Sequence, residues 1–413
     1  FPQRKTLLGL GFLLAFFLNP DVHTVTLFEF RRIVFGMPWL ALAMFGLATG
    51  RRWLMLLGLL VALTAKESIG LYIVTIGLFL LVFERDWKWG LFLMALGAAL
   101  TLLISVWVIP SFQTGQTSDG NYSQLYYYAY LGDSYGEIAR NLLTRPFEII
   151  GQMLQPAQLT AIARVLLPLG FALPFLGRGW RYVLIVVPYL GLMFLSNDVD
   201  MRQLDKWYMA TVLPVLFTAV AVGWQQIPEK WHGRVMLYWL SLTLLAFFLF
   251  SPAPGGREFE AHLYEIDDRD RLGEQFIQQI PPSARVASQL KYVVHLTDHA
   301  DLYHYPWIDI GEENIDYFVL DRHSDPYPFD GPGINEKITN IVSDPRYIIE
   351  AEADGLYLIR QAGEQLPAYE VNLTAEDSIH LGRVEVARAP PPDPYFPPPT
   401  TPTLPAHPRA TLP

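Results

Sequence analysis

The sequence predicts a polytopic α-helical membrane protein that carries a small α/β domain and a proline-rich tail. Hydrophobic residues make up 52% of its 413 residues, and charged residues only 17%. The apolar residues gather in long blocks before residue 252, whereas helix-like and strand-like patterns alternate after it. This composition fits a membrane protein better than a soluble enzyme. We therefore predict a transmembrane domain at 1–251, an extracytoplasmic α/β domain at 252–363, and an extension with a disordered tail at 364–413.

Apolar runs of near-membrane length predict about nine spans, because a span needs about 20 apolar residues and shorter helices are tolerated inside a bundle. The run 53–83 as a single helix would be roughly 46 Å long, well beyond a hydrocarbon core of about 30 Å. We therefore expect two short helices that meet at Lys66 and Glu67. The predicted spans are 6–19, 33–49, 53–65, 69–83, 89–109, 160–176, 180–196, 207–224 and 234–251.

The distribution of lysine and arginine predicts which side of the membrane each loop occupies. With nine spans, all the short basic loops fall on one side, and the positive-inside rule makes that side cytoplasmic. The turn at Lys66 and Glu67, the loop 110–159 and everything after residue 251 then face outward. The basic loops contain Arg4 and Lys5, Arg51 and Arg52, Arg85 and Lys88, Arg178 and Arg181, and Lys230 and Arg234.

The external loop 110–159 is rich in tyrosine, with five between Tyr122 and Tyr130. Tyrosine suits the headgroup zone of a membrane, and Ser134 is a suitable cap for an amphipathic helix that follows it. Two interpretations stay open for this loop: a structural re-entrant collar, or one wall of a lipid-side binding site.

The segment after Pro252 alternates between helical and strand patterns. "DRDRLGEQFIQQIP", "QLKYVVHLT" and "INEKITNIVSD" predict helices, whereas "RVAS" and "DYFVLD" predict strands. "YIIEAEADGLYLIRQ" predicts two strands hinged at Asp354 and Gly355. This alternation predicts a partly parallel sheet. The last 24 residues hold 11 prolines, so we expect an extended tail that could bind protein partners.

Charge and cysteine content exclude several kinds of site. Residues 1–251 hold 18 basic and 13 acidic residues, and residues 252–413 hold 12 and 27, so a slightly basic part precedes an acidic one. The chain has no cysteine, which excludes disulfides and thiolate sites. No basic patch for nucleic acid is present.

Because an apolar run begins close to Phe1, we expect the sequence to be a fragment that lacks its natural N-terminus.

Several motifs resemble GT-C membrane glycosyltransferases, which include the protein O-mannosyltransferases and the aminoarabinose transferase of lipid A modification. "RRWLMLLGLLVALTAKESIGLYIVTIGLFLLVFERDWKWG" is similar to a hairpin of those enzymes, and "DKWYMATVLPVLFTAVAVGW" to one of their late helices. Nearly the whole chain resembles a bacterial family of predicted membrane proteins, a domain of unknown function linked to GT-C folds. "LFEFRR", Lys66 with Glu67, and "IDYFVLD" carry that likeness, although Arg31 and Ser68 depart from its pattern.

The resemblance implies a GT-C-like fold and an enzyme that takes a sugar from a polyprenyl-phosphate carrier at the outer face of the bacterial cytoplasmic membrane. Lys66, Arg31 and Arg32 then hold the lipid phosphate, and Glu67 supports Lys66 because a charge at that depth needs a partner. The alternative is that Lys66 and Glu67 only solvate a tight turn.

The resemblance also places the catalytic acid in a first external loop, which we expect to precede Phe1. Glu29 is the best remaining acid on the outer face, and its alternative role is that of a charged helix start. In "NDVDMRQLDKWY", Asp205, Lys206 and Tyr208 are supporting candidates. Asp198 and Asp200 could hold a divalent cation, which is the only cofactor we consider, and a solvated loop is the simpler interpretation.

Our leading hypothesis is therefore a GT-C-like glycosyltransferase that acts by inverting displacement. An external acid activates the acceptor while cations hold the departing lipid phosphate. The alternative is a non-catalytic membrane scaffold or assembly subunit that binds partners through its soluble domain and tail.

Overall fold

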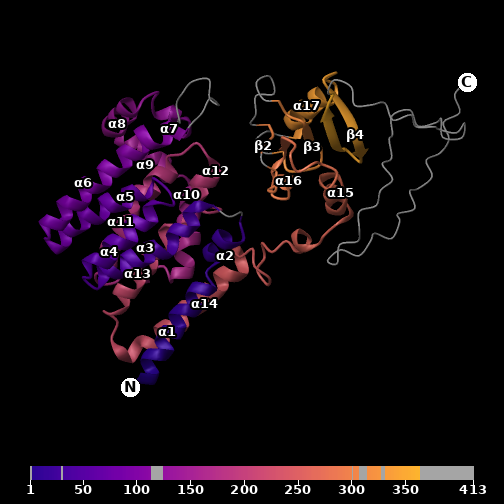
Figure 1. Ribbon diagram of the computed structural model, residues 1–413. Helices are drawn as coiled ribbons and strands as arrows, with labels where there is room; N and C mark the ends of the chain where they lie inside the picture. Colours follow the sequence, from indigo (N-terminus) through magenta and orange to yellow (C-terminus); the bar gives the residue numbers. More distant parts are fainter. Residues whose placement is uncertain are drawn as a thin grey trace, which may run out of the picture. The chain divides into compact units, whose positions relative to one another are not determined.

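The computed structural model describes residues 2–28, 31–112, 124–299, 301–306, 314–326 and 331–362. The chain divides into two compact units, Phe1–Glu265 and Ile266–Pro413. The first unit is helical and the second contains a small sheet (Figure 1). The predicted tail lies outside the described residues.

The helical unit is built largely from pairs of neighbouring helices. α3 packs against α4 and α5 against α6, while α11 and α13 pack together, and α1 runs beside α14 (Figure 1). Its α-helices are α1 Pro2–Phe17, α2 Pro20–Leu27, α3 Arg32–Ala48, α4 Arg52–Leu63, α5 Ile69–Phe79, α6 Trp87–Leu103, α7 Ile109–Phe112, α8 Tyr135–Thr144, α9 Pro146–Met153, α10 Pro156–Leu166, α11 Gly179–Phe194, α12 Val199–Gln203, α13 Val212–Trp224 and α14 His232–Phe250.

The expectation of about nine spans in a GT-C-like bundle is wrong. Within the described residues, two helices are long and apolar enough to cross a membrane: Trp87–Val108, with a mean hydropathy of 2.4, and Glu229–Phe250, with 1.7. A third candidate arises only if Thr6–Phe17 and Pro20–Leu27, which meet at a 54° bend, count as one span. The assignment of every loop to a side, which assumed nine spans, falls with that count.

Helix length and burial explain the correction. The other apolar helices have 10–17 residues, and 17 residues rise only about 26 Å, less than the core of about 30 Å. Much of their apolar surface packs in a protein core, where Tyr72, Ile73 and Ile76 of α5 are at most 1% exposed. By contrast, only 11% of the Trp87–Val108 window is buried inside the protein. Apolar sequence therefore reflects helix packing as well as lipid contact.

The second unit holds a five-stranded sheet in the order β2-β1-β3-β5-β4. β1 is parallel to β2 and β3, whereas β5 is antiparallel to β3 and β4. The helices and strands that the sequence predicts are present, and β2 is a strand that the sequence did not predict. The elements are α15 Asp268–Ile277, β1 Val286–Ser288, α16 Leu290–Val293, β2 Leu302–His304, β3 Tyr317–Asp321, α17 Gly331–Val342, β4 Tyr347–Ala353 and β5 Leu356–Gln361.

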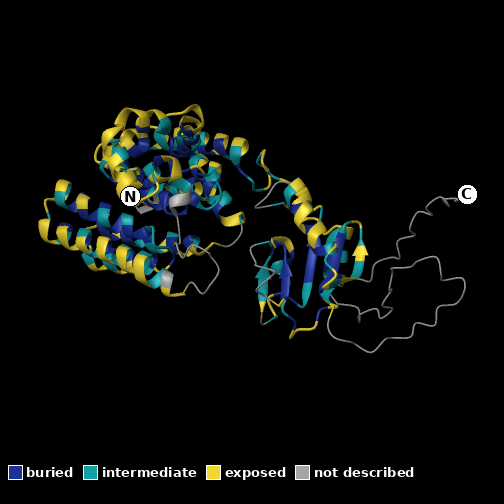
Figure 2. Ribbon diagram, turned by 90° about the horizontal axis from the view of Figure 1, so that it is seen from above, coloured by how far each residue is buried: buried dark blue, intermediate teal, exposed yellow. Residues whose placement is uncertain are grey.

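Burial follows from the position of each strand. Residues of β1 and most of β3 are buried, whereas β4 at the edge carries exposed positions (Figure 2). Hydrophobic cores lie on both faces of the sheet, one with Phe276 of α15 and the other with Ile338 of α17. A central strand covered on both faces explains the near-continuous apolar run "YFVL".

Glycines allow the short helices of the first unit to approach closely. A Cβ on Gly58 of α4 would lie 2.5 Å from the carbonyl oxygen of Trp39 and 2.6 Å from the amide nitrogen of Ala43, both in α3. At the α5–α6 contact, a Cβ on Gly77 would lie 2.7 Å from the carbonyl oxygen of Gly90. Small residues at such contacts permit the backbone proximity that membrane helices use for packing.

We expect Gly58→Ala to destabilise the helical unit, because its added methyl group meets backbone atoms that cannot rotate away. Overpacking of this kind costs about 1–3 kcal/mol. Gly233→Ala is the matched control, since nothing lies within 4 Å of its Cβ position. The measurement is thermal unfolding of both purified variants followed by tryptophan fluorescence. Equal stability of the two variants would contradict the packing argument.

Candidate functional site

Lys66 and Glu67 lie in the turn that joins α4 and α5. The backbone carbonyl oxygens of Lys66 and Glu67 accept hydrogen bonds from the amides of Ile69 and Gly70, at 3.1 and 2.9 Å. These bonds start α5, and both side chains stay partly exposed. The turn joins two short apolar helices that are too short for membrane spans, which corrects the expectation of a hairpin of two spans.

The structure brings Lys66 into the electrostatic range of Arg31 and Arg32. Burial lowers the pKa of Lys66, the nearby Glu67 carboxylate opposes this effect, and the positive charges of Arg32 and Arg31 lower the pKa further. Both arginines lie at the N-terminus of α3, where the exposed amide groups also carry partial positive charge. Three predicted phosphate ligands therefore gather on one positive region, with Glu67 among them.

Aromatic rings extend this positive region. The Arg31 guanidinium lies 4.4 Å from the centre of the Trp207 ring, and the Lys206 ammonium lies 5.4 Å from that of Phe28. The Phe28 and Trp207 ring centroids are 5.1 Å apart. Stacking on aromatic faces fixes the direction of these two cations. We call Arg31, Arg32, Lys66, Lys206, Phe28 and Trp207 the basic–aromatic cluster.

The segment that carries Lys206 and Trp207 has a strained backbone. Leu204 and Lys206 adopt φ angles of 55° and 56°, a left-handed conformation that costs energy in residues other than glycine. Lys206 forms an ion pair with Asp200 at 2.5 Å. The segment is therefore held in a defined conformation, whereas the sequence favours a solvated loop.

The acidic residues of this segment, Asp198 and Asp200, already have partners within the protein. Asp198 caps α12 by accepting a hydrogen bond from the amide of Met201 at 2.8 Å, and Asp200 pairs with Lys206. The described residues contain no group of three or more metal-ligating side chains. Nothing in this geometry supports the divalent cation that the sequence suggested at Asp198 and Asp200.

The remaining predicted residues lie in different surroundings. Tyr208 is buried with its ring centroid 5.3 Å from that of Trp207, so it supports the aromatic side of the cluster. Asp205 instead faces Arg164, with 3.9 Å between carboxylate and guanidinium. Glu29, the proposed catalytic acid, lies outside the described residues.

Sequence reasoning missed Asp21 and Arg164, which form a buried ionic group behind the strained segment. Asp21 is 2% exposed, and its carboxylate lies 3.8 Å from the Arg164 guanidinium. Arg164 also donates to the backbone carbonyl oxygens of Gln203 and Leu204, at 3.3 and 3.1 Å. The signal was present in "NPD", where Asn19 caps α2. A lone arginine in an apolar helix such as α10 also requires a partner, either an acidic side chain or a backbone carbonyl.

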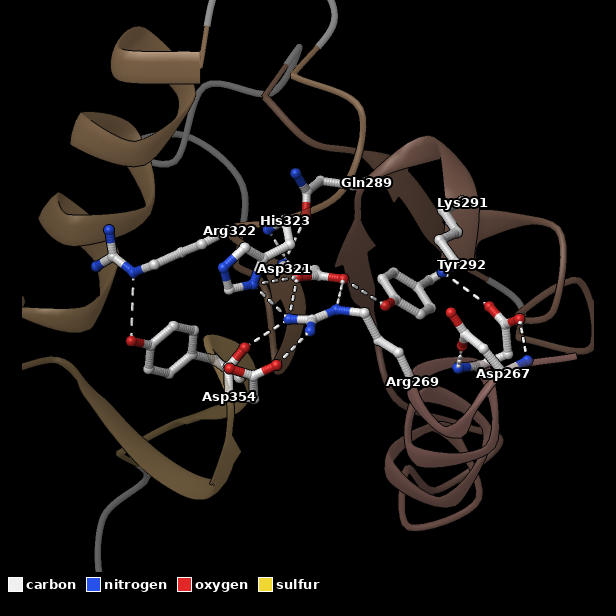
Figure 3. A network of polar contacts seen from close by, with 11 residues as sticks. Asp267, Arg269, Gln289, Lys291, Tyr292, Asp321, Arg322, His323 and Asp354 are labelled. Atoms are coloured by element: carbon white, nitrogen blue, oxygen red, sulfur yellow. Dashed lines mark hydrogen bonds and ion pairs between the residues drawn. The ribbon is translucent and has the colours of Figure 1, made fainter. Parts of the chain in front are cut away.

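A second polar group lies in the α/β unit, where β3 ends (Figure 3). Asp321 is fully buried and accepts two hydrogen bonds from the Arg269 guanidinium, both at 3.0 Å. It also accepts from the Tyr292 hydroxyl at 2.8 Å and from the amide of His323 at 2.9 Å. The Asp321 amide donates to the Gln289 side-chain oxygen at 2.6 Å.

This network is structural rather than reactive, because the carboxylate oxygens of Asp321 already accept hydrogen bonds from groups within the fold. Burial alone would raise the pKa of Asp321, but the hydrogen bonds from Arg269, His323 and Tyr292 lower it below its ordinary value. Arg269 also reaches Asp354 at 2.7 Å, in the turn between β4 and β5. One buried ion pair thus links α15, β3 and the hairpin.

A family model described as "Predicted membrane protein (DUF2079)" matches residues 4–358. No curated protein matches the chain.

We expect the α/β unit to lose stability in acid through Asp321. Because folding depresses its pKa, the stabilisation is complete above the unfolded pKa of about 3.9 and is lost as the pH falls through the lower folded value. Asp321→Asn should cost about 3–5 kcal/mol at pH 7, since it leaves Arg269 without its buried partner. The variant should also show a weaker dependence on pH between about 5 and 3.

The measurement is hydrogen exchange of β3 and β5 peptides in the full chain, corrected for intrinsic rates. Asp268→Asn is the matched control, because Asp268 is 98% exposed and forms only a surface pair with Arg271. That control should change stability by less than about 0.5 kcal/mol. Equal protection in the Asp321 and Asp268 variants would rule out a structural role for the Asp321–Arg269 ion pair.

Proposed function

The chain belongs to the DUF2079 family of predicted membrane proteins, and we propose that it binds the phosphate group of a membrane lipid at the basic–aromatic cluster. The observation that carries this proposal is that the charges of Arg31 and Arg32 act on Lys66, although Lys66 lies in the turn before α5 and the two arginines lie at the start of α3. Guanidinium and ammonium groups together suit a phosphate, since arginine offers paired donors and lysine a compact charge.

The backbone at the cluster favours the same ligand class. None of the described side chains caps the N-terminus of α3, which begins beside Arg31. Backbone N–H groups at a helix N-terminus bind anions, and this effect adds to that of the side-chain cations. Trp207 suits the headgroup zone, because its ring is largely apolar and its indole N–H is polar. A lipid phosphate therefore fits better than a soluble anion.

We further propose glycosyl transfer from a polyprenyl-phosphate sugar, which is what the motif resemblance to GT-C enzymes implies. In this scheme, Lys66, Arg31 and Arg32 stabilise the negative charge that develops on the departing lipid phosphate. A carboxylate, for which Glu29 is the sequence candidate, takes the proton of the acceptor hydroxyl. The acceptor oxygen then bonds to the anomeric carbon as the bond between that carbon and the phosphate oxygen breaks. Phosphate binding without transfer would instead favour the scaffold.

We propose that the α/β unit lies outside the bacterial cytoplasmic membrane, because of the charges at the start of the Glu229–Phe250 helix. Lys230 and Arg234 lie at the N-terminal end of the Glu229–Phe250 helix. The positive-inside rule assigns that end to the cytoplasm. The C-terminal end of a spanning α14, and the unit that follows it, then face outward.

Substitution of Lys66 tests the phosphate site. Lys66→Ala should weaken binding of undecaprenyl phosphate to the full chain in nanodiscs by about 10–100-fold, because it removes a charged donor worth about 1.5–3 kcal/mol. Lys230→Ala is the matched control, since Lys230 is exposed and lies in another part of the helical unit. It should leave the dissociation constant within twofold. Equal affinities of both variants would refute the site.

The absence of cysteine permits a direct test of orientation. We expect a membrane-impermeant maleimide to label the Ser343→Cys variant on intact cells, because Ser343 is an exposed residue of the α/β unit. The Lys230→Cys variant should react only after permeabilisation. The opposite pattern would place the α/β unit in the cytoplasm.

A further inference from the structure

A cavity of about 210 Å³ adjoins the basic–aromatic cluster. Its walls come from α2 and its C-terminal cap, including Thr24 and Phe28, and from the segment after α14, including Glu258, Glu260 and Tyr264. All these residues belong to the helical unit. Phe28 belongs to both the cavity and the cluster. It lines the cavity, and its ring packs against Trp207 and lies under the Lys206 ammonium. A phosphate held at the cluster therefore has its substituent close to this cavity.

The charges around the cavity limit what it can hold. Glu258 and Glu260 disfavour an anionic group inside it. A group with hydroxyls suits these side chains, because ionised carboxylates act only as hydrogen-bond acceptors and hydroxyls donate to them. The rings of Phe28 and Tyr264 add apolar faces beside these acceptors.

Glu258 is the side chain best placed to accept such hydrogen bonds. Glu260 has a histidine partner, His262, at 3.5 Å. No ion pair within the described part of the chain engages Glu258. Burial raises its pKa, Arg164 opposes this effect, and Asp205 adds to it. The cavity is also smaller than the roughly 300–1,000 Å³ of sites for drug-sized ligands, so it fits one small ring or chain.

We propose that this cavity binds a small, hydroxyl-bearing group without negative charge that is esterified to the phosphate at the basic–aromatic cluster, with Glu258 accepting hydrogen bonds from its hydroxyls. This inference rests on the proposed phosphate site and extends it to the substituent. Two kinds of lipid share this chemistry. One is a sugar on a polyprenyl phosphate, and the other is a phospholipid with a polyol headgroup.

The test compares four lipids on the full chain in nanodiscs: undecaprenyl phosphate, undecaprenyl phosphate glucose, phosphatidic acid and phosphatidylglycerol. We expect at least one hydroxyl-bearing lipid to bind about fivefold or more tightly than its bare counterpart, the gain of about one hydrogen bond. The sugar pair and the glycerol pair distinguish the two sources. Either preference supports the proposal.

Glu258→Gln should reduce this preference, because a neutral amide oxygen is a weaker acceptor than a carboxylate, and should leave the affinity for the bare phosphates within twofold. Tyr264→Ala is a second variant that should reduce the preference. Glu265→Gln is the matched control, because Glu265 is exposed in the same segment and does not line the cavity. Equal affinities for hydroxyl-bearing and bare lipids would overturn this inference and leave the phosphate site standing. If no phosphate lipid binds the wild-type chain, the proposed function itself fails.

Discussion

The ionic contacts of Arg164 hold together parts of the helical unit that are far apart in sequence. A guanidinium on an apolar helix needs compensation, because the cost of burying an unpaired charge exceeds that of most single packing defects. Arg164 finds it in Asp21, in Asp205 and in two backbone carbonyl oxygens. These contacts bind α10 to α2 and to the strained segment from Leu204 to Lys206. The direction of Lys206 and Trp207, and with it the shape of the cluster, depends on this arrangement.

The α/β unit solves the same problem with a different pair. Asp321 ends a strand that is covered on both faces, and Arg269 approaches it from a helix more than 50 residues earlier. The pair is compensated by Tyr292 and by backbone groups, so its charge is fully used within the fold. In the helical unit, the Arg31 guanidinium lies over the Trp207 ring, and the Lys206 ammonium lies over the Phe28 ring and pairs with Asp200.

Phosphate binding and the short helices fit one physical picture. A phosphate site built at helix ends and turns needs polar groups near apolar surface, without a charge in the middle of a long span. The turn at Lys66 and the start of α3 supply those helix ends. The cavity beside Phe28 adds acceptors and rings next to the cations. A lipid headgroup that combines an anionic phosphate with neutral hydroxyls matches both parts.

The sequence by itself determined the division into an apolar helical part and an α/β part, because hydrophobic periodicity and turn residues are local properties of the chain. It also selected Lys66, Arg31, Arg32 and Lys206 as cations of interest. It could not determine the number of spans, since an apolar helix of 10–17 residues has the same composition whether it faces lipid or another helix. Only the tertiary structure decided that question, and only it revealed Asp21, Arg164 and Glu258, whose roles depend on partners distant in sequence.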